Sequence, residues 1–342
     1  MAAEIISTGG ETDLGISEGE GDADESLTGV EVRDCEVPVS MHGWRLDRAL
    51  AALIPEFSRS YLQQLMGDGA VAWRGAPALK PSAKVSVGDR LQVELRPTQQ
   101  TMAFVAQPMA LEVVFEDADL LVIHKPAGLV VHPAAGHWSG TLLNGLLAHH
   151  AGSSALPRAG IVHRLDKDTS GLMLVGKSRQ AVEALVRAIA AREVHREYLA
   201  LAQGRWKGPA ELDVEQPVGR DPHNRLRMAV LRPETTGAKS ARTSIRLLDG
   251  TDQACLVACK LHTGRTHQIR VHLTWLGHPL VGDAVYGGRT LFGMERQALH
   301  AARLRLAHPV SGAPLAFACE PPADMGQAIA AAGLHYNPAQ LG

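Results

Sequence analysis

Residues 160–178 constrain the fold and the chemistry of this chain more than any other segment. Two short apolar runs, Ile161–Val162 and Leu172–Val175, enclose a polar segment in which basic and acidic residues alternate. The second run is uninterrupted and is followed by Gly176, which is typical of a buried strand. The polar segment is therefore expected to turn at the edge of a sheet, with Asp166 held by its basic neighbours. A carboxylate between cations stays ionised, which suits a nucleophile or a base, although turns also favour Asp on local grounds alone.

Two common motifs match this segment by letter but not by context. Gly171–Ser178 has the spacing of a P-loop, yet the residues between its glycines are Leu-Met-Leu-Val, which would fill a strand rather than cradle a phosphate. His163–Asp166 has the letters of a kinase catalytic loop, but no Gly-rich loop with a strand lysine precedes it and no Asp-Phe-Gly follows. We reject both interpretations.

The nine residues His163–Gly171 read His-Arg-Leu-Asp-Lys-Asp-Thr-Ser-Gly. They resemble the signature of the RluA/RluD-type pseudouridine synthases, most closely the members that act on large-subunit ribosomal RNA. A continuous match of nine residues is far more specific than a spaced glycine pattern. The resemblance implies that Asp166 is the catalytic nucleophile of an enzyme that isomerises uridine in RNA.

Two further motifs resemble the same family and follow in its order. The block Glu116–Leu147 is similar to the first motif of the family, with His124 where Asn or Asp is commoner. The segment Gly264–His272 is similar to the third motif, and there the arginine at the position of Arg270 pairs with the catalytic aspartate. The family also has a tyrosine at the position of Tyr198, which stacks on the target base and is a candidate for proton transfer.

These residue types suit the reaction that the resemblance implies. Pseudouridine formation breaks the N1–C1′ bond, turns the base and rejoins it through C5, so it requires no redox change and no cofactor. Asp166 would act beside the ribose by attack at C1′, by attack at C6 or by initiating elimination, and Arg270 would hold it ionised. Tyr198 and Ile269 would form the slot for the detached base. Base flipping also needs a side chain to fill the gap, and a planar guanidinium suits this role. We therefore expect Arg164 and its neighbour His163 to bind the substrate.

Charge is divided unevenly along the chain, although the net charge is only −2. Residues 1–36 contain eleven acidic residues and one base, Arg33, which leaves residues 37–342 with a net charge of +8. The tail, residues 1–38, is rich in Gly, Ser and acids and is predicted to be disordered. The basic remainder permits a nucleic-acid partner without proving one.

In residues 39–97, the order of Arg45-Leu46-Asp47, Ser58-Arg59-Ser60 and Gly88-Asp89 resembles that of the S4 RNA-binding domain. Apolar residues recur at helical spacing from Leu46 to Ile54, and Ser58 or Ser60 can cap a second helix. The family places basic residues of these helices against RNA phosphates, here Arg45, Arg48 and Arg59. A solvated charged face is the simpler alternative for these three arginines.

The remaining boundaries follow from composition and from the extent of the resemblance. We expect a linker over residues 98–110, a catalytic domain over residues 111–324 and a C-terminal tail over residues 325–342. The predicted fold class is α+β, with a mixed, largely antiparallel sheet, flanking helices and a small α/β S4 domain.

Metal binding and membrane insertion are not expected. The chain has four cysteines without a Cys-x2-Cys pair, and its sixteen histidines show no zinc-ligand spacing. It contains no run of 18 apolar residues. A cytoplasmic monomer that acts on ribosomal RNA, free or in an assembling ribosomal particle, is therefore the first hypothesis. An S4-type RNA-binding protein without catalysis is the alternative, and a metal-dependent hydrolase fits less well.

Overall fold

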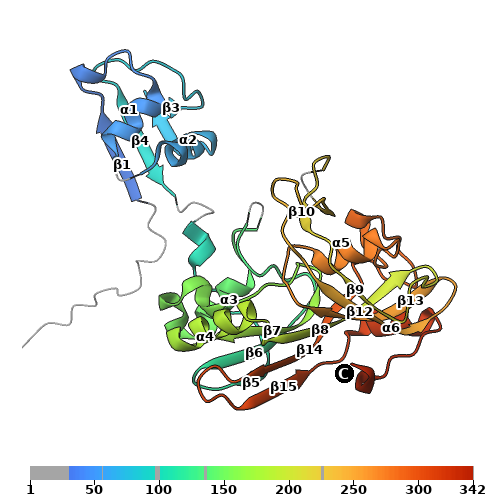
Figure 1. Cartoon of the computed structure of the whole chain (residues 1–342). Helices are drawn as coiled ribbons and strands as arrows, with labels where there is room; N and C mark the ends of the chain where they lie inside the picture. The colour runs from blue at the N-terminus through green and yellow to red at the C-terminus, as the bar shows by residue number, and fades with distance from the viewer. Residues whose placement is uncertain (1–30, 56, 97–100, 135–136, 225–226, 342) are drawn as a thin grey trace, which may run out of the picture. The chain divides into compact units, whose positions relative to one another are not determined.

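The computed structural model describes residues 31–55, 57–96, 101–134, 137–224 and 227–341, and the chain divides after Thr98 into two units (Figure 1). Residues 1–30, which are predicted to be disordered, lie outside the described residues. In the described part of the chain, no helix has the length and apolar character that crossing a bilayer requires.

The small unit is an antiparallel sheet covered by two helices. The sheet order is β1-β4-β2-β3, with β1 Glu31–Glu36, β2 Val71–Trp73, β3 Ala76–Pro77 and β4 Arg90–Leu95. The strand β1 differs from the prediction that residues 1–38 form a disordered tail, because it pairs along its whole length with β4. An edge strand with one solvent-facing side needs few apolar residues, so the acidic composition concealed it.

The helices of the small unit follow the predicted pattern. In α1, Leu46–Leu53, the side chains of Leu46 and Leu50 are fully buried. Ser58 caps α2, Arg59–Gly67, because its hydroxyl oxygen accepts a hydrogen bond from the Tyr61 N–H at 3.3 Å. The likeness of this unit to an S4 domain stays a prediction.

The large unit is built on a mixed sheet that has nine strands within the described residues. Their order is β5-β6-β7-β14-β8-β13-β12-β9, and β15 pairs with the part of β14 that follows its short pairing with β7. All pairs are antiparallel except β7 with β14, so the predicted α+β class with a largely antiparallel sheet is confirmed. The bounds are β5 Glu112–Glu116, β6 Leu120–Lys125, β7 Ser170–Gly176, β8 His195–Gln203, β9 Glu211–Val214, β12 Thr243–Gly250, β13 Ala254–Leu261, β14 Leu299–Ala307 and β15 Pro314–Ala318.

Helices flank this sheet, and a separate two-stranded ribbon lies near α5 (Figure 1). The helices are α3 Leu142–His149, α4 Arg179–Ala190, α5 Gln268–Trp275 and α6 Ala323–Ala331, and the ribbon is formed by β10 Val218–Arg220 and β11 Met228–Val230. Thr141 occupies the N-cap of α3 and the Ser178 hydroxyl caps α4.

Two segments predicted to lie outside the catalytic domain pack against it. In the predicted linker, the Ala103 and Val105 carbonyls accept hydrogen bonds from the Asn144 side chain, which lies on α3. In the predicted C-terminal tail, Met325 of α6 and Leu341 are buried in an apolar cluster with β8 and β13. Sequence patterns locate such segments poorly, because their apolar residues are few and their partners are distant in the chain.

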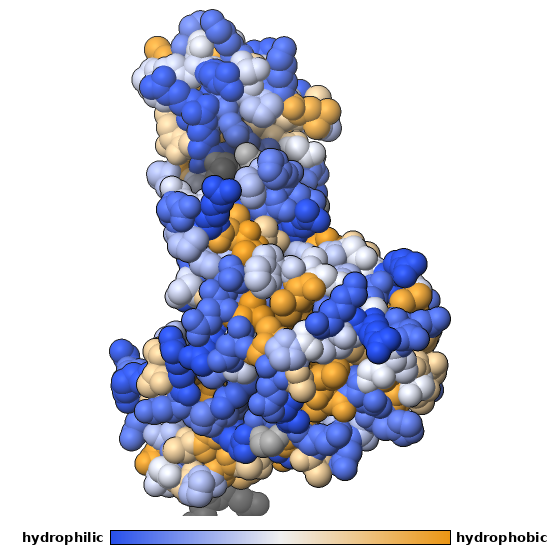
Figure 2. Space-filling model, turned by 45° about the vertical axis from the view of Figure 1, so that its right-hand side comes forward, coloured by the Kyte–Doolittle hydropathy of each residue, from blue (hydrophilic) through white to orange (hydrophobic). Residues whose placement is uncertain are grey.

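Figure 2 shows that hydrophilic residues cover most of the face in view, with apolar residues in smaller patches.

Candidate active site

The loop that carries Asp166 ends where β7 begins. The Thr169 N–H donates a hydrogen bond to the Asp166 carbonyl at 3.1 Å, which closes the turn. Gly171 then enters the sheet at a φ of +115°, and a Cβ at this position would lie 2.3 Å from the Ala301 carbonyl oxygen of β14. Only glycine tolerates this approach, so the end of the loop is fixed against β14.

Lys125, the last residue of β6, anchors the same loop through hydrogen bonds to backbone carbonyls. Its side chain is fully buried, and its ammonium group donates to the carbonyls of Pro126, Leu129 and Lys167 at 2.7–2.9 Å. Burial lowers the pKa of Lys125 to about 8, against the opposing effect of Asp168 and Asp166. A cation that holds three carbonyls joins the turn after β6 to the Asp166 loop, so the loop backbone has one defined position.

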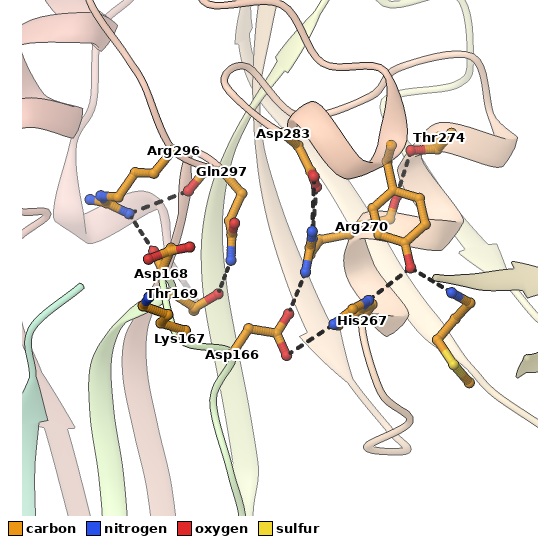
Figure 3. Close-up of polar contacts among 12 residues, drawn as sticks. Asp166, Lys167, Asp168, Thr169, His267, Arg270, Thr274, Asp283, Arg296 and Gln297 are labelled. Atoms are coloured by element: carbon orange, nitrogen blue, oxygen red, sulfur yellow. Dashed lines mark hydrogen bonds and ion pairs between the residues drawn. The ribbon is translucent and has the colours of Figure 1, made fainter. Parts of the chain in front are cut away.

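Asp166 is bound by Arg270 of α5 and not by its sequence neighbours. Arg270 Nη1 donates to Asp166 Oδ2 at 3.0 Å, while Nε and Nη2 form a bidentate pair with Asp283 at 2.7 and 2.9 Å (Figure 3). The prediction that adjacent basic residues hold Asp166 is therefore wrong. Neighbouring side chains along this loop point in different directions, whereas Arg270 of α5 reaches the Asp166 carboxylate.

The arginine is the buried member of this cluster. Its side chain is 4% exposed and that of Asp283 is 1% exposed, whereas that of Asp166 is 17% exposed. Burial acts to lower the pKa of Arg270, but the hydrogen bonds and charges of Asp283 and Asp166 outweigh burial and raise it. The guanidinium is thus permanently charged and is fixed by Asp283. Its remaining nitrogen holds the Asp166 carboxylate, which is the partly exposed member of the cluster.

His267 approaches Asp166 from its other side. Its Nε2 lies 3.9 Å from Asp166 Oδ1, and its Nδ1 is hydrogen-bonded to the Tyr286 hydroxyl at 2.8 Å. His267 occupies the N-cap of α5 with a φ of +56°, in the left-handed region that non-glycine residues rarely adopt. Thr266, one residue before it, is exposed. Burial lowers the pKa of His267, and the charge of Asp166 partly opposes this effect.

Tyr198 and Ile269 line the apolar side of the same site. Tyr198 lies on β8, the strand between β14 and β13, and is 4% exposed. Burial raises the pKa of its hydroxyl, and no hydrogen bond joins that hydroxyl to the other described residues. Ile269, also 4% exposed, lines a small cavity together with Tyr198 and Asp166. A flat apolar surface thus lies beside the carboxylate.

A larger cavity of about 740 Å³ opens in front of Asp166 and Tyr198. His163 and Arg164, which are predicted to bind the substrate, both line it. Arg164 is exposed and has no hydrogen-bond or ion-pair partner within the described ranges. The other basic side chains in the wall are those of His132, Arg158, Arg192, Arg196, His262 and Arg265.

In the small unit, two of the three predicted RNA-binding arginines bind a buried acid. Arg45 and Arg59 donate to Asp47, at 3.1 and 2.8 Å, and each guanidinium remains about half-exposed. Arg48 instead stacks over the Trp44 ring, with its guanidinium carbon 4.2 Å from the ring centroid. The contact of these arginines with RNA stays a prediction.

One set of side chains among the described residues has metal-ligand atoms in proximity. Nitrogen atoms of His124 and His300 and the sulfur of Cys319 lie within 4.8 Å of one another. Hydrogen bonds already occupy most of these groups: His300 with Ser170 and Cys319, and His124 with Glu112. These bonds account for His300, Cys319 and the Nδ1 of His124, whereas His124 Nε2 is buried without a hydrogen-bond partner among the described residues.

Sequence patterns gave no role to four residues that shape this site. Asp283 and His267 lie within family-like segments, but no spacing indicates which side chain they contact. Lys125 belongs to an ordinary turn sequence, and Arg196 stands in a strand beside Tyr198. Arg196 lies second in β8, and its position in the sequence gave no signal that it is buried.

Comparisons with known proteins identify the family. A family model described as RNA pseudouridylate synthase matches residues 119–275. The chain is 47% identical over 300 residues to the ribosomal large subunit pseudouridine synthase D of Neisseria meningitidis serogroup A, a match that covers 84% of this chain and 79% of that protein. It is 45% identical to the protein of the same name from Nitrosomonas europaea, with 86% of each chain covered.

A solved structure supports the fold. Human RNA Pseudouridylate Synthase Domain Containing 4 is similar with a TM-score of 0.53 at 24% identity, and the match covers 66% of this chain and 94% of that chain. From the sequence relatives, the chain belongs to the RNA pseudouridylate synthase family. It is accordingly an isomerase, and the resemblance seen in its sequence is confirmed.

Proposed function

We propose that this protein converts specific uridines of large-subunit ribosomal RNA to pseudouridine. The names of the relatives at 45–47% identity support this substrate. A ribosomal RNA substrate also fits a cytoplasmic monomer that acts on free RNA or on an assembling ribosomal particle.

One observation carries the proposal. Asp166 is held by a buried arginine at 3.0 Å, remains partly exposed, and lines the same cavity as Tyr198. An ionised, aimed carboxylate beside a flat apolar wall is what the isomerisation requires. The charged pair keeps the carboxylate ready to react, and the wall retains the base after it detaches.

The reaction conserves all atoms of the base. The N1–C1′ bond breaks and its electron pair stays on the uracil, with Asp166 stabilising the ribose side. The uracil turns between Tyr198 and Ile269, and C5 bonds to C1′. The C5 proton then leaves to a base, and N1 acquires a proton. Asp166 is the carboxylate in the wall placed to accept the C5 proton, and the protonated Tyr198 hydroxyl can donate a proton in the same cavity.

Flipping the uridine into this cavity requires that its stacking be replaced. Arg164 has the properties for this role, because it is exposed at the cavity beside Asp166 and its guanidinium is planar. In the small unit, Arg45 and Arg59 present half-exposed guanidinium groups that can bind phosphates outside the target site.

The test is to incubate the purified protein with unmodified transcripts of large- and small-subunit ribosomal RNA and to map pseudouridines by carbodiimide-dependent primer-extension stops. We expect stops at a few positions of the large-subunit transcript. Modification confined to the small-subunit transcript would contradict the substrate, and RNA binding without any stop would support the binding-only alternative.

A further inference from the structure

Two shielded nitrogen atoms in the wall of the large cavity lack a hydrogen-bond partner. They are Arg196 Nε and His163 Nδ1. The Leu174 N–H donates to His163 Nε2 at 3.0 Å, so a neutral imidazole must carry its proton on Nδ1. Burial lowers the pKa of His163 to about 3, with Arg196 adding to the effect, so the ring is neutral at pH 7. Both nitrogen atoms are therefore donors without an acceptor.

Arg196 is unusual because it is buried without a counter-charge. It lies on β8, which pairs with β13 and β14 on its two sides, and it is 6% exposed. Within the described part of the chain, no hydrogen bond or ion pair joins its guanidinium to another residue. Burying a charged group in this way is unfavourable unless an ion of opposite charge compensates for the lost water.

The cavity wall does not provide that ion. Among the described residues that line it, Asp166 is the one acid, and Arg270 already binds it. The exposed arginines Arg158, Arg164 and Arg192 add further positive charge. The cavity therefore combines a deep, unpaired cation with a basic entrance, which favours an anion that enters from solvent.

The backbone leaves room for the guanidinium. A Cβ at Gly264 would lie 3.3 Å from Arg196 Nη1, which is closer than most side chains tolerate. Gly264 belongs to the segment between β13 and α5, two residues before the exposed Thr266. The absence of a side chain at this position lets Arg196 lie beside the loop backbone at the cavity wall.

We propose that Arg196, with the neutral ring of His163 in the wall of the same cavity, binds a phosphate of the RNA backbone next to the uridine that enters the Asp166 cavity. The inference rests on the proposed function, since it takes RNA as the anion. A phosphodiester group offers two oxygens to the Nη groups of the planar guanidinium, which are not shielded as Nε is. Binding there would draw the sugar of the flipped nucleotide toward Asp166 and remove the unfavourable burial of the free cation.

The decisive variant is Arg196→Met, which removes the charge and keeps most of the volume. Arg192→Met is the matched control, because Arg192 is an exposed arginine of the same cavity. Arg196→Lys keeps the positive charge but lacks the planar guanidinium with its paired N–H donors. The measurements are the thermal midpoint of the full-length protein with and without inorganic phosphate, and the Kd for a large-subunit rRNA fragment at 200 mM salt.

If Arg196 binds a phosphate, Arg196→Met raises the thermal midpoint of the free protein by about 2–4 °C. In the same variant, inorganic phosphate no longer raises the thermal midpoint. The same change weakens RNA binding by about ten- to a hundredfold, whereas Arg192→Met weakens it less than about threefold because an exposed contact is screened. Arg196→Lys retains part of the response to phosphate.

A lower midpoint in Arg196→Met, with RNA and phosphate binding unchanged, would show that Arg196 is structural and overturn the proposal. Equal losses of binding in Arg196→Met and Arg192→Met would also overturn it, because the effect would then be general charge. The phosphate measurement needs no turnover, so it decides the site even if the rRNA transcripts are not modified.

Discussion

The two units of the chain each hold an aspartate with arginine, but in opposite arrangements. In the small unit, Asp47 is fully buried and binds Arg45 and Arg59, whose side chains are 51% and 50% exposed. In the large unit, Arg270 is buried and binds Asp166, which is the more exposed member. The inner partner is the acid in one unit and the base in the other.

The difference shows what each cluster offers to a substrate. A buried acid with outer arginines presents fixed positive charge, which suits contact with phosphates and carries out no chemistry. A buried arginine with an outer acid presents a fixed carboxylate, which suits bond making and breaking. The hydrogen bond from Arg45 is the main cause that keeps the pKa of Asp47 far below its usual range. We therefore propose that the same interaction type serves binding in the small unit and reactivity in the large unit.

The largest effect is expected where the inner base is changed. Arg270→Lys keeps the charge but cannot bind Asp283 with two nitrogens and Asp166 with a third. We expect kcat to fall by about 10²–10³-fold with little change in KM, measured by pseudouridine formation under saturating RNA. Arg246→Lys on β12, whose partner Glu211 is exposed, should leave kcat unchanged. Equal kcat values for both variants would show that Arg270 has no special role in the chemical step.

The matching change in the small unit should affect binding and not the chemical step. Asp47→Asn removes the acceptor charge shared by Arg45, Arg59 and Gln63. We expect a loss of about 2 kcal/mol in the local stability of α1 and α2 and severalfold weaker RNA binding, with kcat preserved. Hydrogen exchange of the full chain reports the first effect and filter binding the second. Asp68→Asn, at the exposed C-cap of α2, is the control, and a large fall in kcat for Asp47→Asn would contradict the division of roles.

Mild acid should lower the stability of the large unit more than that of the small unit. Burial lowers the pKa of His300, which is fully buried, to about 4. Because the folded state binds fewer protons than the unfolded state between about pH 4 and pH 6.5, the contribution of His300 to stability is lost as the pH falls through that window. We expect the large unit to lose about 2 kcal/mol from this residue between pH 7.5 and pH 5.

The small unit should not respond in the same window. His42, its one histidine among the described residues, is exposed, and Asp47 stays ionised well below pH 5. Urea unfolding followed by hydrogen exchange in each unit at the two pH values measures the difference. In His300→Asn the pH dependence of the large unit should shrink, and an unchanged dependence would show that other groups cause it.

Local patterns predicted the elements of this fold better than its contacts. Ser58 caps α2 as its position indicates, since a cap depends on residues three or four apart. The strand β1 was missed, because its pairing depends on a strand more than fifty residues later.

The candidate site shows the same limit. Resemblance to the family drew attention to Asp166, Tyr198 and Arg270, which lie together in the structure. It gave no indication of Asp283, which fixes Arg270 from 13 residues along the chain, or of the buried charge of Arg196. Such partners are chosen by the geometry of the folded chain, which spacing in the sequence does not encode.

The central claim is that Asp166 is the reactive group, which the buried arginine serves to position. Release of tritium from large-subunit rRNA labelled at uridine C5 tests it most directly, because the isomerisation must remove the C5 hydrogen. The wild-type protein should release tritium, while Asp166→Asn should fold normally, bind the same RNA and release none. Release by Asp166→Asn at a rate near that of the wild type would contradict the account.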